Sequence, residues 1–167
     1  MQEKIINIKS VLQNSTNIVI TVHKSPDGDA LGSALALSGV LSKLDHKVTV
    51  VSPNSYAPFL YWMKGNEDIL IYSENIEEAT KVTQNADIIF MLDYNHLSRI
   101  GDYSNVVRGS DAFKLMIDHH QEPEQDVPKN GDRLRPHECS SLTHQFRHPG
   151  YDRDDHKRSD HGAETTK

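Results

Sequence analysis

Ionisable side chains gather at three places in the chain, each directly after an apolar, mostly β-branched run. The three clusters are His23, Asp27 and Asp29 after residues 18–22, Asp93 after 88–92, and Asp118, His119 and His120 after 115–117. Imidazole mixed with carboxylate oxygen suits Mn²⁺, Mg²⁺ or Fe²⁺, and no cluster contains the thiolate that favours structural zinc. These donors exceed what one ion needs. Two ions bridged by one carboxylate are therefore expected, an arrangement that serves phosphoryl transfer, and the solitary Asp93 is the natural bridge.

The apolar runs must be neighbouring strands if these clusters are to meet. Residue patterns predict strands at 17–22, 47–51, 69–72, 87–92 and 114–117, and helices at 3–14, 29–44, 58–63 and 76–85. This alternation predicts an α/β fold, a Rossmann-like parallel sheet flanked by helices. The carboxyl ends of parallel strands share one edge, where open α/β sheets bind ligands, so the three clusters are expected to converge. The apolar face of the helix at 29–44 is expected at Leu37, Val40, Leu41 and Leu44.

Composition limits the class of protein. The chain has 167 residues, a formal charge of −6 and one Cys. This suits one α/β domain, excludes a disulfide framework and argues against a large basic nucleic-acid surface. No apolar run approaches the roughly 20 residues of a membrane span, and the N-terminus lacks a signal-peptide pattern. A cytoplasmic location without a membrane partner is expected.

The last part of the chain differs from the rest. Residues 121–167 hold seven apolar residues in 47 and five of the ten His. Such a segment buries too little apolar surface to offset the entropy lost on ordering. We therefore expect a folded domain at 1–124 and a disordered tail at 125–167. His144 and His148 have the spacing of metal ligands on a helix, but without an apolar period they are interpreted as part of the tail.

Three motifs resemble those of the DHH phosphoesterases. They are HKSPDGDALGSALAL at 23–37, DYNHLSRIG at 93–101 and IDHHQEP at 117–123, in the order in which the family has them. The bacterial bifunctional oligoribonuclease and 3′-phosphoadenosine-5′-phosphate phosphatase group (NrnA-like) is the most similar, and SPNSYAPFLYWMKG at 52–65 is also similar to it. The resemblance is expected to end near Glu124, with a truncated or replaced C-terminus after an incomplete DHH domain.

The resemblance implies ligands for two Mn²⁺ ions. His23 and Asp27 would bind the first ion, and Asp29 and His119 the second. Asp93 would bridge both ions and act as a catalytic residue. Family members supply one further Asp to the second site, and no Asp of residues 125–167 follows an apolar strand, so the second site is expected to be incomplete.

The resemblance also implies roles around the substrate. His120 would be catalytic and would contact the scissile phosphate, as a donor to it or to the leaving oxygen. Arg99 would bind a phosphate, because its planar fork suits that geometry. Asp118 is expected to orient the neighbouring imidazoles rather than bind metal.

The expected function is that of a manganese-dependent phosphoesterase, an exoribonuclease-type hydrolase of short oligonucleotides, of 3′-phosphoadenosine 5′-phosphate, or of both. The alternatives are an inorganic pyrophosphatase of the same superfamily and a truncated, catalytically impaired metal- and nucleotide-binding domain. The expected partner is an oligonucleotide or nucleotide phosphoester, and a homodimer is left open. Four aromatic residues could stack bases but are expected to pack beside the sheet: Tyr56, Phe59, Tyr61 and Trp62.

Overall fold

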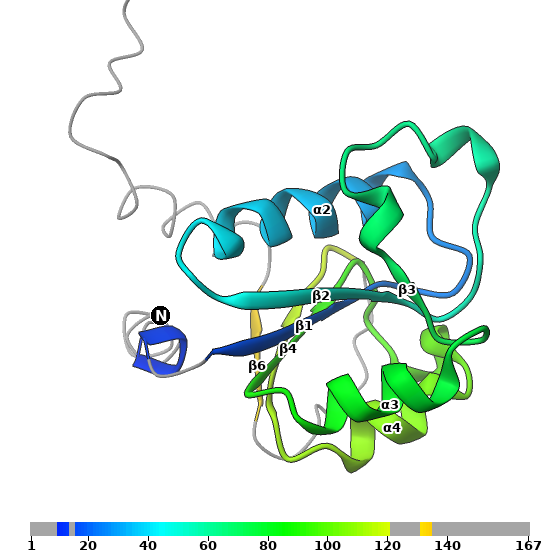
Figure 1. Cartoon of the computed structure of the whole chain (residues 1–167). Helices are drawn as coiled ribbons and strands as arrows, with labels where there is room; N and C mark the ends of the chain where they lie inside the picture. The colour runs from blue at the N-terminus through cyan, green and yellow to red at the C-terminus, as the bar shows by residue number, and fades with distance from the viewer. Residues whose placement is uncertain (1–9, 14–15, 121–130, 135–167) are drawn as a thin grey trace, which may run out of the picture.

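A six-stranded sheet forms the centre of the molecule (Figure 1). The computed structural model describes residues 10–13, 16–120 and 131–134. The strands are β1 (Asn17–Thr21), β2 (Lys47–Ser52), β3 (Leu70–Ile71), β4 (Ile88–Leu92), β5 (Phe113–Ile117) and β6 (Gly131–Leu134). All neighbours pair in parallel, in the order β3-β2-β1-β4-β5-β6. The order reverses direction between β1 and β4, which creates the switch point at which such sheets bind ligands.

Helices cover both faces of this sheet. Helix α2 (Gly28–Ser42) lies on one face, and α3 (Ile76–Gln84) and α4 (Tyr103–Gly109) lie on the other (Figure 1). Side chains alternate along each strand, so Ile18 and Ile20 pack in the core beside α2, whereas Val19 packs in the core beside α3 and α4. Three 3₁₀ turns complete the described elements: η1 (Pro58–Leu60), η2 (Asn66–Asp68) and η3 (Leu97–Ile100). Among the described residues, no helix combines the length and apolar character needed to cross a membrane.

The α/β fold expected from the sequence is confirmed, with element ends shifted by one or two residues. The helix expected at 58–63 is the shorter 3₁₀ turn η1, and α4 was not expected. Residues 10–13 are helical, as expected for 3–14, and the remainder of that segment lies outside the described residues.

The buried face of α2 differs from the expected one. Val40 and Leu44 were expected to face the core, but their exposed fractions are 57% and 53%. The helix instead buries Ala30, Leu31 and Ala34, together with the expected Leu41. The small side chains of Ala30 and Ala34 permit close approach of α2 to the sheet. Because α2 is apolar around much of its circumference, the spacing of its apolar residues did not identify the buried face.

Strand β6 corrects the expectation for residues 125–167 at four positions. Gly131–Leu134 pairs in parallel with β5, in a segment for which composition predicted no strand. Strand pairing uses backbone N–H and C=O groups. The edge of β5 presents these groups to any partner strand, whether its side chains are apolar or polar. The other residues of that segment, among them His144 and His148, lie outside the described residues, so their disorder stays a prediction.

Candidate metal centre

The carboxyl ends of β1, β4 and β5 bring the three ionisable clusters together. Thr21 lies beside Met91, and Leu92 lies beside Ile117, so the residues that follow these strands emerge side by side. Two groups of side chains have potential ligand atoms within 4.8 Å of one another: His23, Asp27 and Asp93, and Asp93, His119 and His120. The predicted convergence is therefore present in the structure, and Asp93 belongs to both groups.

Asp93 has an unusual backbone and an unusual environment. Its φ is 61°, in the left-handed region that Asp tolerates better than most residues, and its N–H donates to the Ile117 carbonyl at 3.1 Å. The buried Oδ1 accepts no well-aligned hydrogen bond from the described residues. It lies 3.1 Å from Nε2 of His119 and 3.9 Å from Nδ1 of His120, while Oδ2 lies 3.9 Å from Nε2 of His23. A carboxylate with one buried oxygen beside two imidazoles and a second oxygen that faces a third imidazole fits a metal ligand.

The charges around Asp93 favour a bound cation. Burial raises the pKa of the Asp93 carboxyl, and the neighbouring Asp29 and Asp27 carboxylates also raise it. His119 and His23 lower it, but the net direction is upward. Several carboxylates in a partly buried place repel one another, and a divalent cation relieves this repulsion. The residues present therefore fit a metal ion.

His23 is oriented by the backbone that follows it. Its Nδ1 lies 2.9 Å from the Lys24 carbonyl, which can only accept, so this nitrogen carries the proton. In the neutral ring the lone pair is then on Nε2, the atom that faces Asp93. The Lys24 N–H donates to the Arg99 carbonyl at 2.8 Å and fixes the loop against η3. The His23 side chain is 9% exposed and is thus prepared as a ligand.

Asp27 caps the start of α2. Its Oδ1 accepts the backbone N–H groups of Asp29 and Ala30, both at 3.0 Å. The Ala30 hydrogen bond is the main reason that the pKa of Asp27 is lowered, and this keeps the carboxylate ionised. Among the described residues, its hydrogen bonds use Oδ1 alone, so Oδ2 is available for an ion. The His23, Asp27 and Asp93 group is the one expected for the first metal ion.

The second group is more open to solvent. The His119 side chain is 58% exposed and that of His120 is 35% exposed. Nδ1 of His120 lies 2.7 Å from Oδ1 of Asp118, and the His120 backbone N–H donates to Oδ2 of the same carboxylate at 3.2 Å. Asp118 is 2% exposed and in neither metal group, which agrees with the orienting role expected for it.

The roles of two expected site residues stay predictions. Asp29, expected as a ligand of the second ion, belongs to neither group of clustered ligand atoms among the described residues, whereas His120 belongs to the second group. Asp29 nevertheless lines the cavity beside Asp93. Arg99 is exposed. Its carbonyl accepts from the Lys24 N–H and its own N–H donates to the His96 carbonyl, and phosphate binding by its guanidinium stays a prediction.

A cavity of about 220 Å³ opens beside the metal groups. It is lined by Asp29, Ser33, Leu92, Asp93, Ile117, Asp118 and His119. Sequence reasoning missed Ser33, whose hydroxyl donates to the Ala30 carbonyl at 3.0 Å. The signal was available, because Ser33 follows Asp29 by four residues and so shares its helix face.

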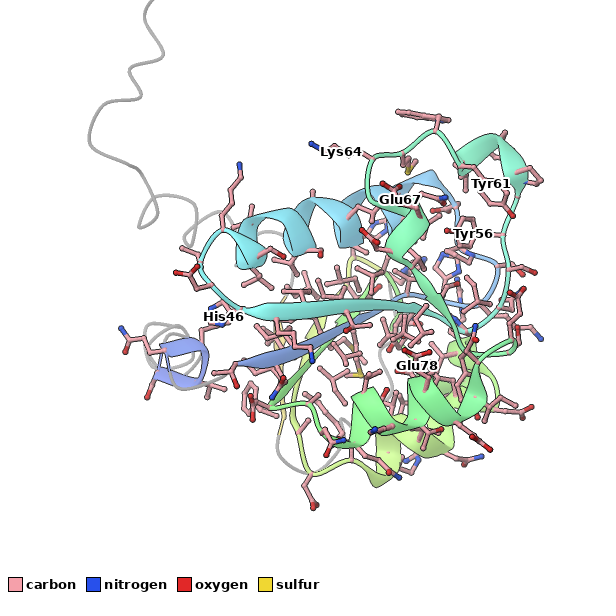
Figure 2. The ribbon with its side chains drawn as sticks, in the orientation of Figure 1. His46, Tyr56, Tyr61, Lys64, Glu67 and Glu78 are labelled. Carbon is pink, nitrogen blue, oxygen red and sulfur yellow. The ribbon has the colours of Figure 1, made fainter. Side chains whose placement is uncertain are left out.

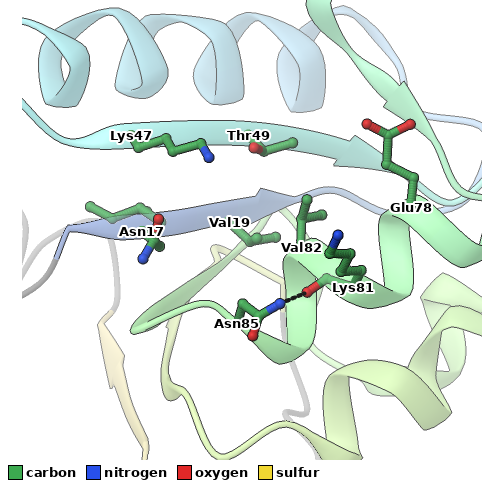
Figure 3. Close-up of a pocket in the computed structure, with 9 residues that line it drawn as sticks. Asn17, Val19, Lys47, Thr49, Glu78, Lys81, Val82 and Asn85 are labelled. Atoms are coloured by element: carbon green, nitrogen blue, oxygen red, sulfur yellow. Dashed lines mark hydrogen bonds between the residues drawn. The ribbon is translucent and has the colours of Figure 1, made fainter.

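A second cavity, of about 280 Å³, lies at the opposite edge of the sheet (Figure 3). Asn17 and Lys47, the first residues of β1 and β2, line it together with Lys81 and Glu78 of α3. Among the described residues, no group of three potential metal ligands lies there. The edge that carries Asp93 is therefore the candidate site.

Comparisons with known proteins place the chain in a family. The family described as the DHH family, N-terminal domain, matches residues 17–143. The match continues beyond Glu124, where the resemblance was expected to end. That boundary was set too early because the segment that contains β6 is polar yet part of the matching region.

A crystal structure of an exopolyphosphatase-related protein from Bacteroides fragilis is similar, with 39% identity and a TM-score of 0.77. The similarity covers 87% of this chain but 43% of that one, so the chain spans less than half the length of that protein. No curated protein sequence matches at a comparable level. The family match covers most of the chain, and the chain belongs to the DHH family.

Proposed function

We propose that this chain contributes the metal centre of a manganese-dependent phosphoesterase that hydrolyses short oligonucleotides, 3′-phosphoadenosine 5′-phosphate, or both. The observation that supports this most strongly is the position of Asp93. One partly buried carboxylate belongs to both metal groups, and its buried Oδ1 lacks a hydrogen bond from the described residues. Sites with two ions about 3.5–4 Å apart use such a shared carboxylate in phosphoryl transfer.

The two groups divide the ligands between two ions. His23, Asp27 and Asp93 would hold the first, and Asp93 and His119 would hold the second, with Asp29 close by. His120 would not bind metal, because its Nδ1 faces Asp118 and its Nε2 would carry the proton for the leaving oxygen. Bound divalent ions supply positive charge that polarises a phosphoryl oxygen and offsets the charge that develops during hydrolysis. Mixed imidazole and carboxylate ligands suit Mn²⁺ among the biological ions.

The side chains have separate tasks in this proposal. Hydrolysis adds a water oxygen to phosphorus, breaks the ester P–O bond and leaves an oxygen that needs a proton. His120 would supply that proton, and Asp118, hydrogen-bonded to its Nδ1 at 2.7 Å, would stabilise the ring while it is positively charged. Asp93 would accept a hydrogen bond from the attacking water through Oδ1, which accepts no well-aligned hydrogen bond from the described residues. Arg99 would bind a neighbouring phosphate group.

Polyphosphate is a second candidate substrate, because the similar crystal structure is described as exopolyphosphatase-related. Hydrolysis of a phosphoanhydride needs the same shared carboxylate and proton donor. The nucleotide proposal rests on the resemblance of segment 52–65 to the oligoribonuclease group, whereas the polyphosphate candidate rests on the structural relative. A substrate series that contains a dinucleotide, 3′-phosphoadenosine 5′-phosphate, pyrophosphate and polyphosphate separates the two.

Calorimetric titration with Mn²⁺ tests the site before any substrate is chosen. Asp93→Asn should remove binding at both sites, since an amide is a weak ligand and cannot bridge two cations. Asp45→Asn is the matched control, because Asp45 also has a positive φ, of 64°, but lies after α2 and outside both metal groups. Equal Mn²⁺ affinity in the two variants would contradict the assignment. Metal binding without hydrolysis of any of the four substrates would instead indicate a metal- and nucleotide-binding domain.

A further inference from the structure

Three large aromatic side chains are exposed on the segment between β2 and β3. Phe59 is 73% exposed, Tyr61 52% and Trp62 79%. We call residues 56–64 the aromatic loop; Figure 2 labels Tyr56, Tyr61 and Lys64 on it. The expectation that these aromatics pack beside the sheet holds for Tyr56, which is 8% exposed, and fails for the other three. Neighbouring exposed aromatics are typical of a surface that binds something.

The aromatic loop is held in place from beneath. Leu60 is 3% exposed and packs in the core beside α2. The Tyr56 hydroxyl donates to Oδ1 of Asn66 at 2.6 Å, and the Tyr61 ring contacts Tyr56 edge to face, with centroids 5.6 Å apart. A ligand that binds here therefore meets a preformed surface, and little conformational entropy is lost in ordering that surface.

The aromatic loop lies beside the candidate metal centre. A methyl group placed on Gly28, the first residue of α2, would lie 3.7 Å from Leu60 and 3.9 Å from Met63. Gly28 directly follows the metal-group member Asp27. The chain after β2 is also tied to the loop after β1, because the Ser25 N–H donates to the Asn54 side chain at 2.7 Å. The segment that carries the exposed rings thus packs against the start of α2, next to the edge of the sheet where phosphate chemistry is proposed.

We propose that the aromatic loop stacks an unpaired nucleobase of the substrate while a phosphate of the same molecule lies at Asp93. This rests on the proposed function and deepens it, because it selects substrates that carry a base over polyphosphate. Aromatic side chains stack any of the bases without hydrogen-bond readout, which suits short strands of mixed sequence. Two exposed cations belong to the neighbouring segments and suit the phosphates of a nucleotide: Lys24 directly follows His23, and Lys64 ends the aromatic loop.

A broad docking face for a second copy fits the surface less well. The other exposed apolar side chains near α2 are Val40 and Leu44, at the far end of the helix. Val40 lies twelve residues beyond Gly28, which is about 18 Å along a helix. The exposed rings are therefore a small, isolated patch next to the phosphate site, of a size suited to a base.

The chain reports on this site through its own fluorescence, because Trp62 is its sole Trp. Titration with adenosine 5′-monophosphate in the presence of Mn²⁺ should quench Trp62 emission to saturation. Ribose 5-phosphate, which has the same sugar and phosphate without the base, should not quench it. Phe59→Leu should weaken adenosine 5′-monophosphate binding by about 5- to 150-fold, the range for loss of one stacked base. Val40→Ala is the control and should leave the affinity unchanged.

Three outcomes would overturn the stacking proposal. The first is equal affinity for adenosine 5′-monophosphate and ribose 5-phosphate with unchanged Trp62 emission. The second is an unchanged Michaelis constant for a dinucleotide in Phe59→Leu and Trp62→Leu. The third is an emission shift with protein concentration in the absence of ligand, which would indicate that a second copy covers the rings. The proposed function fails separately. Quenching by the nucleotide without hydrolysis of any phosphoester would support the stacking surface and contradict the proposed enzyme activity. Hydrolysis at the same rate in wild type, Phe59→Leu and Trp62→Leu would support the enzyme activity and contradict the stacking surface.

Discussion

Asp118→Asn tests whether a buried carboxylate sets the tautomer of His120. Asp118 accepts from the His120 backbone N–H at 3.2 Å and from its Nδ1 at 2.7 Å. An Asn side chain has one oxygen and one NH₂ group, so it can accept only one of these two hydrogen bonds. The backbone N–H cannot change, so the Asn oxygen should face it and the NH₂ should face Nδ1. The ring must then move its proton from Nδ1 to Nε2.

The expected loss follows from this change of tautomer. His120 in the variant cannot carry protons on both nitrogens while Nδ1 faces an NH₂ group, so it cannot serve as the proton donor to the leaving oxygen. Removing an outer partner of a metal-site His commonly costs about 10- to 100-fold in metal affinity or activity, which is about 1.4–2.7 kcal/mol. Loss of one buried charged hydrogen bond should also lower the free energy of unfolding by about 1–3 kcal/mol.

Nitrogen-15 NMR of the imidazole rings is the assay, because it reads the tautomer without any substrate. The wild-type His120 ring should show its proton on Nδ1, and Asp118→Asn should show it on Nε2. Asp102→Asn removes the same charge from an exposed Asp that makes no side-chain cap hydrogen bond, and it should leave the ring unchanged. An unchanged tautomer in Asp118→Asn, with hydrolysis within twofold of the wild type, would refute the reasoning.

Two further predictions concern stability. Asp87 accepts the backbone N–H groups of Thr16 and Asn17 at 2.8 Å each, so Asp87→Ala should lower the free energy of unfolding by about 1–2 kcal/mol at pH 7. These hydrogen bonds lower the pKa of Asp87 below 3.8, so its stabilising effect is complete above that pH and is lost as the pH falls through the folded value. Urea unfolding at pH 7 and pH 2 should show the difference from wild type shrinking, and a constant difference would contradict the cause. Gly65 has a φ of 87°, so Gly65→Ala should cost about 1–2 kcal/mol, whereas Gly39→Ala, inside α2 with open space around it, should add about 1 kcal/mol in thermal melts.

The position of the site could be predicted because it depends on strand ends alone. Runs such as 18–22 and 88–92 are too β-branched and apolar to be anything but buried strands, and in a parallel sheet their ends share an edge. That reasoning locates His23, Asp93 and His119 without any knowledge of side-chain directions. It does not give the order of ligands around an ion. Spacing also does not reveal that Nδ1 of His120 lies 2.7 Å from Asp118 and 3.9 Å from Asp93, which makes His120 a member of the second group.

The errors have physical causes. Helix α2 is apolar on most sides, so its period could not identify the face that carries Ala30 and Ala34. Strand β6 contains a single apolar residue and is held by backbone pairing to β5, which composition does not report. The exposure of Trp62 was missed because a large aromatic side chain is expected to be buried unless it binds a ligand or partner.

The capping of α2 by Asp27 links the metal centre to the fraying of a helix. The carboxylate that closes the first turn, through the amides of Asp29 and Ala30, is the one that would hold the first ion. Binding at its other oxygen restrains the side chain and so also restrains the turn, which carries Ser33 into the cavity. Opening of this turn and ion binding are linked equilibria. The factor by which a bound ion suppresses opening equals the factor by which opening weakens ion binding. The exchange rates of the Asp29 and Ala30 amide protons should therefore fall as Mn²⁺ is added, which makes two backbone amides a direct gauge of metal occupancy.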